Sequence, residues 1–187
     1  MIGYALCGSF CTLSQSLAQL KLLVESGYDV LPVMSFNVYT QSTRFFDADE
    51  LRKQVESICG HSVIHTIQDA EPLGPKIALD ALVICPCTGN TLAKLACGIT
   101  DTPVCMAAKA HLRSDRPLLI ALSTNDALSG NLKNIAVMLE KKSVYFVPMR
   151  QDDPEKKPHS LVADFSKLSD TLAAALQGKQ FQRLFQI

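Results

Sequence analysis

The sequence predicts an α/β fold, a Rossmann-like three-layer α/β/α arrangement around a six-stranded, mostly parallel sheet. Short apolar runs alternate with amphipathic helical patterns along the whole chain. That order places parallel strands in one sheet with helices on both of its faces. The chain has 187 residues, of which 48% are hydrophobic. This is enough for a full core, so we expect a single domain over residues 1–187.

The first half of the chain contains three predicted strands and two predicted helices. Apolar residues recur at helical spacing from Leu13 to Val24, and Gly27 ends this helix. A second helix covers residues 47–60, with acidic residues in its first turn and Gly60 at its end. The predicted strands are residues 2–7, 29–35 and 62–67.

The second half continues the alternation of strands and helices. One short helix is predicted from about residue 91 to residue 97. Another begins at Thr102 and Pro103, a capping residue followed by proline at the first helical position. Residues 132–142 form a third helix. The predicted strands of this half are residues 80–86, 117–122 and 144–148.

The end of the chain is less regular. Residues 149–160 are polar and interrupted by prolines, which predicts an exposed loop. A final helix is predicted at about residues 160–176. The tail after it places three apolar residues at helical spacing, Phe181, Leu184 and Phe185. We expect the segment from about 160 to 187 either to pack on the domain or to lie at a subunit contact.

The charge balance argues against several classes of partner. Lys+Arg and Asp+Glu are both 18, so the formal net charge is zero. This gives no electrostatic reason to expect nucleic acid or an anionic membrane surface. No stretch approaches the roughly 20 apolar residues that span a bilayer, and the start of the chain lacks the basic segment of a signal peptide. We therefore expect a cytoplasmic protein.

The seven cysteines include no C-x-x-C pair. Structural zinc sites usually need two such closely spaced pairs. On a strand, Cys85 and Cys87 would point to opposite faces of the sheet. We therefore expect small buried packing residues and no metal site.

Function is expected at one edge of the sheet, because ligands of open parallel sheets bind beyond the carboxyl ends of the strands. After the first strand, Gly8, Ser9 and Thr12 precede a helix N-terminus, where free N–H groups can hold a phosphate. An ordinary tight turn explains the same residues. After the second strand, Ser35 and Asn37 lie beside aromatic residues, which suits a planar heterocycle or a solvated loop.

Two further loops carry polar side chains at the same edge. Thr88, Asn90 and Thr91 follow the most apolar strand, and capping of a helix accounts for only part of them. The next strand is followed by a similar group, Ser123, Thr124 and Asn125. Together the two loops predict a pocket lined by hydroxyl and amide groups with almost no charge.

His65 lies near the end of the third predicted strand, so it either faces this pocket or packs in the core. The sequence shows no carboxylate pair and supports no Ser/His/Asp order. It therefore argues against hydrolysis as the chemistry.

Residues 86–101, PCTGNTLAKLACGITD, resemble the P-A-S/T-A-N-T-x-A-K-x-A-x-G-x-x-D motif of a family of FMN-binding flavoproteins. The family includes the cysteine-peptide and phosphopantothenoylcysteine decarboxylases and the UbiX-like flavin prenyltransferases. Here Cys87 and Gly89 stand in the two small positions of the motif, and the resemblance covers roughly residues 2–148. The decarboxylases' P-x-M-N substrate clamp corresponds to residues 122–125, which keep asparagine but lack proline and methionine.

The resemblance implies FMN as cofactor and gives roles to the loop residues. It implies that Ser9 and Thr12 hold the phosphate with the first helix, and that the amides of Asn90 and Asn125 face the substrate. Cofactor contacts are expected from Gly8, Ser9, Thr12, Ser35, Asn37, Thr88, Thr91, Ser123 and Thr124. The expected catalytic residues are His65, Asn90 and Asn125.

Within the family, the chain looks most like an oxidoreductase subunit from spore-forming bacteria that helps aromatise a cyclic dicarboxylate. The resemblance implies an NAD(P)-binding partner subunit, a small dicarboxylate substrate, and a homo-oligomer of the trimer or dodecamer type. Two alternatives are a flavin-dependent decarboxylase of another acid and a non-catalytic accessory subunit without flavin.

Overall fold

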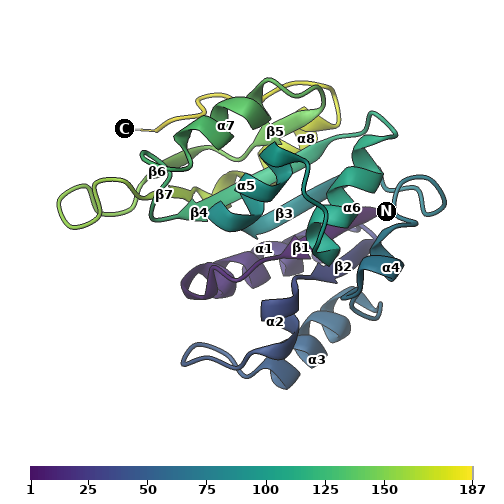
Figure 1. Cartoon of the computed structure of the whole chain (residues 1–187). Helices are drawn as coiled ribbons and strands as arrows, with labels where there is room; N and C mark the ends of the chain where they lie inside the picture. Colours follow the sequence, from purple (N-terminus) through teal and green to yellow (C-terminus); the bar gives the residue numbers. More distant parts are fainter. Residues whose placement is uncertain (187) are drawn as a thin grey trace.

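The computed structural model describes residues 1–186 and shows a seven-stranded sheet between two layers of helices (Figure 1). The strand order is β2-β1-β3-β4-β7-β6, and β5 pairs with β4 beside this path. The predicted three-layer, mostly parallel fold is confirmed. The strands are β1 (Ile2–Leu6), β2 (Val30–Met34), β3 (Ala81–Cys87), β4 (Leu118–Thr124), β5 (Val144–Phe146), β6 (Met149–Gln151) and β7 (Leu161–Ala163).

Eight α-helices and two short 3-10 helices connect these strands within the described residues. The α-helices are α1 (Leu13–Glu25), α2 (Phe36–Thr40), α3 (Ala48–Cys59), α4 (Ile67–Ala70), α5 (Gly89–Cys97), α6 (Pro103–Leu112), α7 (Leu132–Leu139) and α8 (Leu168–Ala175). The 3-10 helices are η1 (Phe10–Thr12) and η2 (Phe165–Lys167). No helix in residues 1–186 combines the length and the apolar character needed to cross a bilayer.

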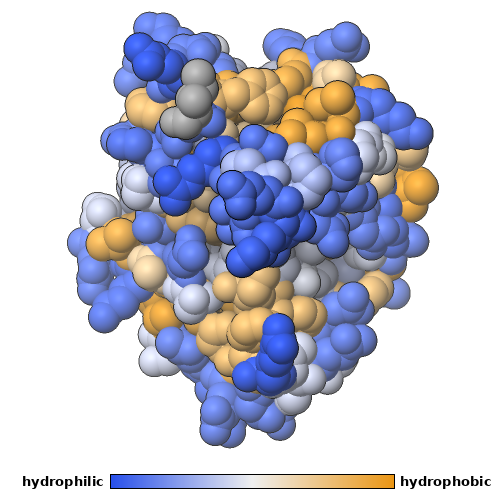
Figure 2. Space-filling model, turned by 90° about the vertical axis from the view of Figure 1, so that its left-hand side faces the viewer, coloured by the Kyte–Doolittle hydropathy of each residue, from blue (hydrophilic) through white to orange (hydrophobic). Residues whose placement is uncertain are grey.

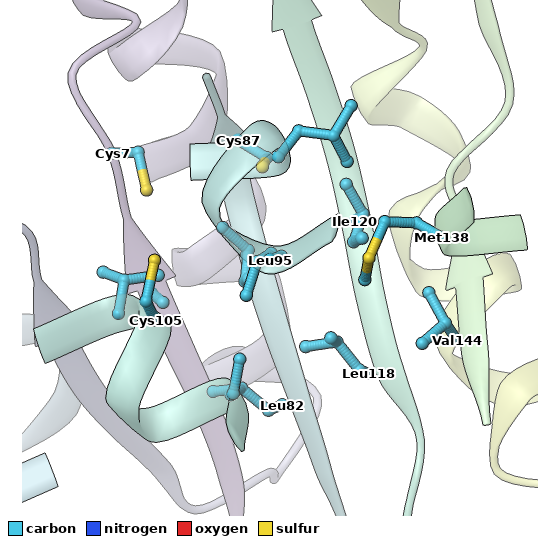
Figure 3. Packing of buried hydrophobic residues seen from close by; sticks show 14 of the residues in the cluster. Cys7, Leu82, Cys87, Leu95, Cys105, Leu118, Ile120, Met138 and Val144 are labelled. Carbon is cyan, nitrogen blue, oxygen red and sulfur yellow. The ribbon is translucent and has the colours of Figure 1, made fainter. Parts of the chain in front are cut away.

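The parallel strands are buried on both faces, as a sheet covered by helices requires. Side chains of β1 alternate between the two cores: Ala5 packs with α4–α7, whereas Tyr4 and Leu6 pack with α1, α3 and α8. Figure 3 shows part of the first core, where residues from α5, α6 and α7 meet the sheet. Because no face of these strands is free, a ligand can reach the sheet only at its edges.

Strand β4 has two different neighbours along one side. Its first half pairs with β5 in parallel, from Leu118 to Ile120, and its end pairs with β7 in antiparallel orientation at Ser123 and Thr124. Residues 149–160 were predicted to be a loop, but β6 begins this segment and is antiparallel to β7. Strand β7 has only three residues, too few for periodicity in the sequence to distinguish a strand from a helix.

Two other predictions about local structure were wrong. The strand predicted at 62–67 is reduced to one bridge between Ile64 and Val33. Thr66 ends it, because its side chain accepts a hydrogen bond from the backbone N–H of Asp69 and starts α4. The helix predicted at 160–176 is shortened to η2 and α8, since β7 occupies its beginning.

The tail is not helical from residue 179 to residue 186. The backbone N–H of Met149 donates to the carbonyl of Leu184, so the tail adds a bridge beside β6. Leu184 packs against the core, whereas Phe185 is 52% exposed. Backbone pairing with β6 therefore replaces the predicted helical arrangement, and a subunit contact through the tail stays a prediction.

Helix α1 offers a matched test of this core. Leu20 is fully buried, whereas Leu22 in the same helix is 47% exposed. We expect Leu20→Ala to lower the free energy of unfolding by about 2–5 kcal/mol, because it leaves a cavity in the core. Leu22→Ala should change the same quantity by about 0.5 kcal/mol or less. Urea denaturation of both variants measures the difference, and equal losses would contradict the assigned faces of α1.

Candidate functional site

A cavity of about 730 Å³ opens at the carboxyl ends of the strands. Its walls come from the loops after β1, β3 and β4, from the loop after α2, and from residues 152–162. Figure 2 looks onto this side of the molecule, where hydrophilic residues project around smaller hydrophobic areas. Eight residues predicted to form the site line the cavity: Gly8, Ser9, Thr12, Thr88, Asn90, Ser123, Thr124 and Asn125.

The loop after β1 forms a helix start without side-chain caps. Thr12 Oγ1 donates to the carbonyl of Ser9 at 2.9 Å and lies 3.0 Å from Ser9 Oγ. Neither side chain caps a backbone N–H of η1 or α1. The partial positive charge of this helix start is therefore not neutralised by a side chain and can face an anionic group in the cavity.

The turn between β3 and α5 is held by a chain of hydroxyl groups. Thr88 caps α5 by accepting a hydrogen bond from the N–H of Thr91 at 3.2 Å, and its hydroxyl donates to Thr91 Oγ1 at 3.0 Å. Thr91 Oγ1 in turn donates to Cys7 Sγ at 3.4 Å, which ties this turn to the end of β1. The hydroxyls of Thr88 and Thr91 are thus used within the protein, and Thr91 lies buried beneath the cavity.

Three side chains at the cavity keep polar groups without a partner. Ser123 Oγ is buried and makes no hydrogen bond in the part of the chain that the structure describes. The side-chain amides of Asn90 and Asn125 have no recorded hydrogen bond within residues 1–186 either, and both side chains are exposed. Leaving a buried hydroxyl without a hydrogen-bond partner costs about 1–3 kcal/mol of folding free energy. A polar ligand in the cavity would give the Ser123 hydroxyl a partner.

The structure leaves four predicted residues outside the lining of the cavity: Thr91, which lies beneath it, and Ser35, Asn37 and His65. Ser35 begins α2, and its buried Oγ has no partner among the described residues. Asn37 adjoins the loop after β1, since its Cβ lies 3.8 Å from where a Cβ on Gly8 would be. His65 stacks on Tyr39 with ring centroids 3.8 Å apart. His65 is not among the residues that line this cavity, and its catalytic role stays a prediction.

A carboxylate that the sequence analysis did not select lies in the wall of the cavity. Asp126 Oδ1 accepts a hydrogen bond from Thr124 Oγ1 at 2.6 Å, and Asn131 Nδ2 lies 2.9 Å from both carboxylate oxygens. The hydroxyl of Thr124, followed by the amide of Asn131, lowers the pKa of Asp126 below its usual range. Asp126 is therefore charged at neutral pH, and both of its partners belong to the same segment, two residues before it and five residues after it.

Three charged side chains from other loops also reach the cavity, Arg44, Asp152 and Lys157. The Arg44 guanidinium lies 4.8 Å from the ring centroid of Phe45 and forms no salt bridge within the described residues. Lys157 pairs with Asp152 at 2.6 Å, and this hydrogen bond raises the pKa of Lys157. The prediction of a pocket with almost no charge is therefore wrong, because loops distant in sequence add charged groups to it.

The cysteines beneath the cavity are packing residues. Cys85 and Cys87 belong to opposite cores, as predicted for neighbours on a strand. Burial raises the pKa of Cys7 and of Cys85 to about 12, so both are thiols at neutral pH. Cys11 and Cys97 are exposed, which corrects the expectation that all seven are buried. Residues 1–186 contain no group of three His, Cys, Asp or Glu side chains placed to hold a metal ion.

Gly89 allows α5 to approach the loop after β4. A Cβ at this position would lie 2.5 Å from both Asn131 Nδ2 and Thr124 Oγ1, and 2.9 Å from Asp126 Oδ1. Any larger residue would displace the Asp126 cluster, which is already fixed by its own hydrogen bonds. Glycine is therefore required at the small position of the motif by a contact between two walls of the cavity.

We expect Gly89→Ala to lower the free energy of unfolding by about 1–3 kcal/mol, because the added methyl group overpacks this contact. Gly130→Ala is the matched control, since its Cβ would meet only Asp126 Oδ2 at an ordinary 3.8 Å. Thermal or urea unfolding of the two variants measures the difference. A Gly89→Ala protein as stable as the control would show that the loop after β4 can move to accept the methyl group without loss of stability.

The comparisons with known proteins agree with this geometry. The chain is 46% identical over 181 residues to the B subunit of dipicolinate synthase from Bacillus subtilis (strain 168), and the match covers 97% of this chain and 90% of the relative. The crystal structure of the B subunit of dipicolinate synthase from Bacillus halodurans C superposes with a TM-score of 0.91 at 41% identity, covering 100% of this chain and 95% of the other.

A more distant solved structure shows how widely the fold is used. The FMN-dependent cysteine decarboxylase SpaF has a TM-score of 0.67 at 23% identity, with 95% of each chain covered, so it shares the fold. The family model described as Flavoprotein matches residues 2–176, nearly the whole chain. The three-layer sheet, the cavity at its carboxyl edge and this match together show that the chain belongs to the Flavoprotein family.

Proposed function

We propose that the chain is the FMN-binding subunit of a dipicolinate synthase and helps to convert dihydrodipicolinate to dipicolinate, pyridine-2,6-dicarboxylate. The main observation that supports this proposal is the cavity. It is lined by polar groups that make no hydrogen bond within residues 1–186: Ser123 Oγ and the side-chain amides of Asn90 and Asn125. The near full-length similarity to the B subunit of dipicolinate synthase supports the choice of substrate. The proposal places the protein in the cytoplasm of the mother cell during sporulation.

The residues of the cavity fit FMN. Its phosphate would lie at the uncapped helix start beside Gly8, Ser9 and Thr12, where N–H groups and the helix dipole attract an anion. Ser123, whose buried hydroxyl has no partner, would donate to or accept from the flavin. Further contacts to the cofactor are proposed from Ser35, Asn37, Thr88, Thr91 and Thr124. Bound flavin would supply a two-electron acceptor for a hydride.

The remaining polar groups suit a dicarboxylate. The amides of Asn90 and Asn125 can donate hydrogen bonds to carboxylate oxygens, and Arg44 can balance their charge. Aromatisation of the dihydropyridine ring removes a hydride and a proton from the substrate. NAD(P) on the partner, the A subunit of dipicolinate synthase, would be the final acceptor of the electrons. A homo-oligomer of the trimer or dodecamer type and a role for His65 belong to the same proposal.

The first test is flavin binding. Titration of the purified chain with FMN should give saturable binding, seen in the visible absorption and fluorescence of the flavin. Ser123→Ala should weaken this binding by about 2- to 10-fold, the effect of one neutral hydrogen bond. The same substitution removes an unpartnered buried hydroxyl, so the flavin-free protein should lose no stability. Ser14→Ala, which changes an exposed serine of α1, is the control.

A chain that stays colourless and does not bind FMN on titration would overturn the flavin proposal. It would favour the alternative of a non-catalytic accessory subunit. Loss of stability in Ser123→Ala without loss of FMN affinity would instead show that Ser123 serves the fold.

The second test is synthesis by the reconstituted enzyme. The chain is mixed with FMN, the A subunit, dihydrodipicolinate and NAD(P), and formation of dipicolinate is followed. Asn90→Ala should reduce synthesis by about 10- to 100-fold, as expected for a lost hydrogen bond to a charged group. FMN affinity should be retained, and Gln54→Ala, an exposed amide on α3, should leave synthesis unchanged.

Unchanged synthesis in Asn90→Ala would remove Asn90 from the site. Release of CO2 from an acid by the chain and FMN alone would point to a decarboxylase. The two results separate the leading proposal from the alternative enzyme class.

A further inference from the structure

A second concave surface lies between the helices α5, α6 and α7, on the sheet face opposite α1. This groove has a volume of about 350 Å³. Its floor is formed by Leu95, Cys105 and Met138, which reach it from three different helices and also belong to the buried core (Figure 3). The groove shares no lining residue with the cavity at the carboxyl ends of the strands.

Helices α6 and α7 each place residues of one helix face along the groove. On α6, Cys105 and Lys109 are four residues apart, and Arg113 follows after four more, so all three share one face. Lys141 follows α7 and lies three residues after Met138. The groove is thus apolar at its floor and cationic at its rim.

The rim cations are not neutralised by the protein. Lys109, Arg113 and Lys141 are exposed and make no salt bridge within residues 1–186. Two other lysines of this face are paired: Lys94 with Asp101 and Lys142 with Asp115, at 2.8 and 2.7 Å. No Asp or Glu lines the groove. Because the whole chain has zero net charge, this local excess of positive charge is a feature of the surface and not of the composition.

The open shape of the groove favours a polypeptide over an enclosed small molecule. Ile99 lines it and is 46% exposed, and the rim residues Lys109 and Lys141 are exposed as well. An enclosed ligand site would cover most of its own lining. Apolar side chains with free cations around them complement a segment in which carboxylates flank an apolar side chain.

We propose that the groove between α5, α6 and α7 docks an acidic segment of the partner protein, with an apolar side chain on Leu95, Cys105 and Met138. The identity of this partner as the A subunit of dipicolinate synthase rests on the proposed function. Helix α5 links the two sites: its first turn forms the cavity wall, and its last turns form the groove. A partner seated here lies next to the cavity without filling it.

The test measures binding of the purified A subunit to the whole chain by isothermal titration calorimetry. We expect the double variant Lys109→Glu/Arg113→Glu to raise the Kd by about tenfold or more, since reversed charges repel an acidic segment. The wild-type affinity should fall as salt concentration rises. Lys53→Glu/Lys179→Glu is the matched control, because it reverses two exposed lysines, on α3 and just after α8, that also make no salt bridge within residues 1–186, and it should change Kd by less than about twofold.

Each outcome has a distinct meaning. FMN titration and thermal unfolding of the same samples establish that the variants are folded. If wild-type and double variant bind the A subunit equally, the groove assignment is overturned while the proposed function stands. If the wild-type chain does not bind the A subunit, the proposed partner and the docking site both fail. If the double variant instead changes the mass of the isolated chain in solution, the groove holds a second copy, which also overturns the assignment.

Discussion

Burial of the parallel strands on both faces is the constraint from which the rest of the molecule follows. Helices cover β1, β3 and all of β4 except Thr124, so the side chains of these strands belong to two cores. Neighbouring strands satisfy their backbone groups. Chemistry is then possible only where the strands stop. All the parallel strands stop at the same edge, which concentrates three loops and the first turns of two helices around one cavity.

Close approach between two of these loops gives the cavity its definite shape. The absent side chain of Gly89 lets α5 meet the Asp126 cluster, whose hydrogen bonds fix the loop after β4. The cavity therefore contains groups of two kinds. Thr88, Thr91 and Asp126 are occupied in holding the walls, whereas Asn90, Asn125 and Ser123 have groups left over for a ligand.

Local chemistry explains what could be predicted from the sequence. The cap at Thr88 and the stop at Gly98 act within one helix, and the apolar run of β3 is buried whatever its neighbours are, so both were readable from adjacent residues. Long-range contacts explain the rest. The Asp126 cluster meets Gly89 only in the folded chain, and β7 is defined by its pairing with the end of β4 and with β6. The stack of His65 on Tyr39 joins two separate segments. These contacts cannot be predicted from the spacing of residues along the sequence.

The divided edge of β4 has a consequence for how such a protein can diversify. The strand is completed at its end by β7, and Ser160 donates from its hydroxyl to the carbonyl of Thr124 at 3.3 Å. One wall of the cavity is thus contributed by a segment that lies outside the parallel part of the sheet, β1 to β5. A change in the length or sequence of this outer wall would therefore alter the volume and polarity of the cavity, while the parallel strands and the helix start after β1 keep their positions.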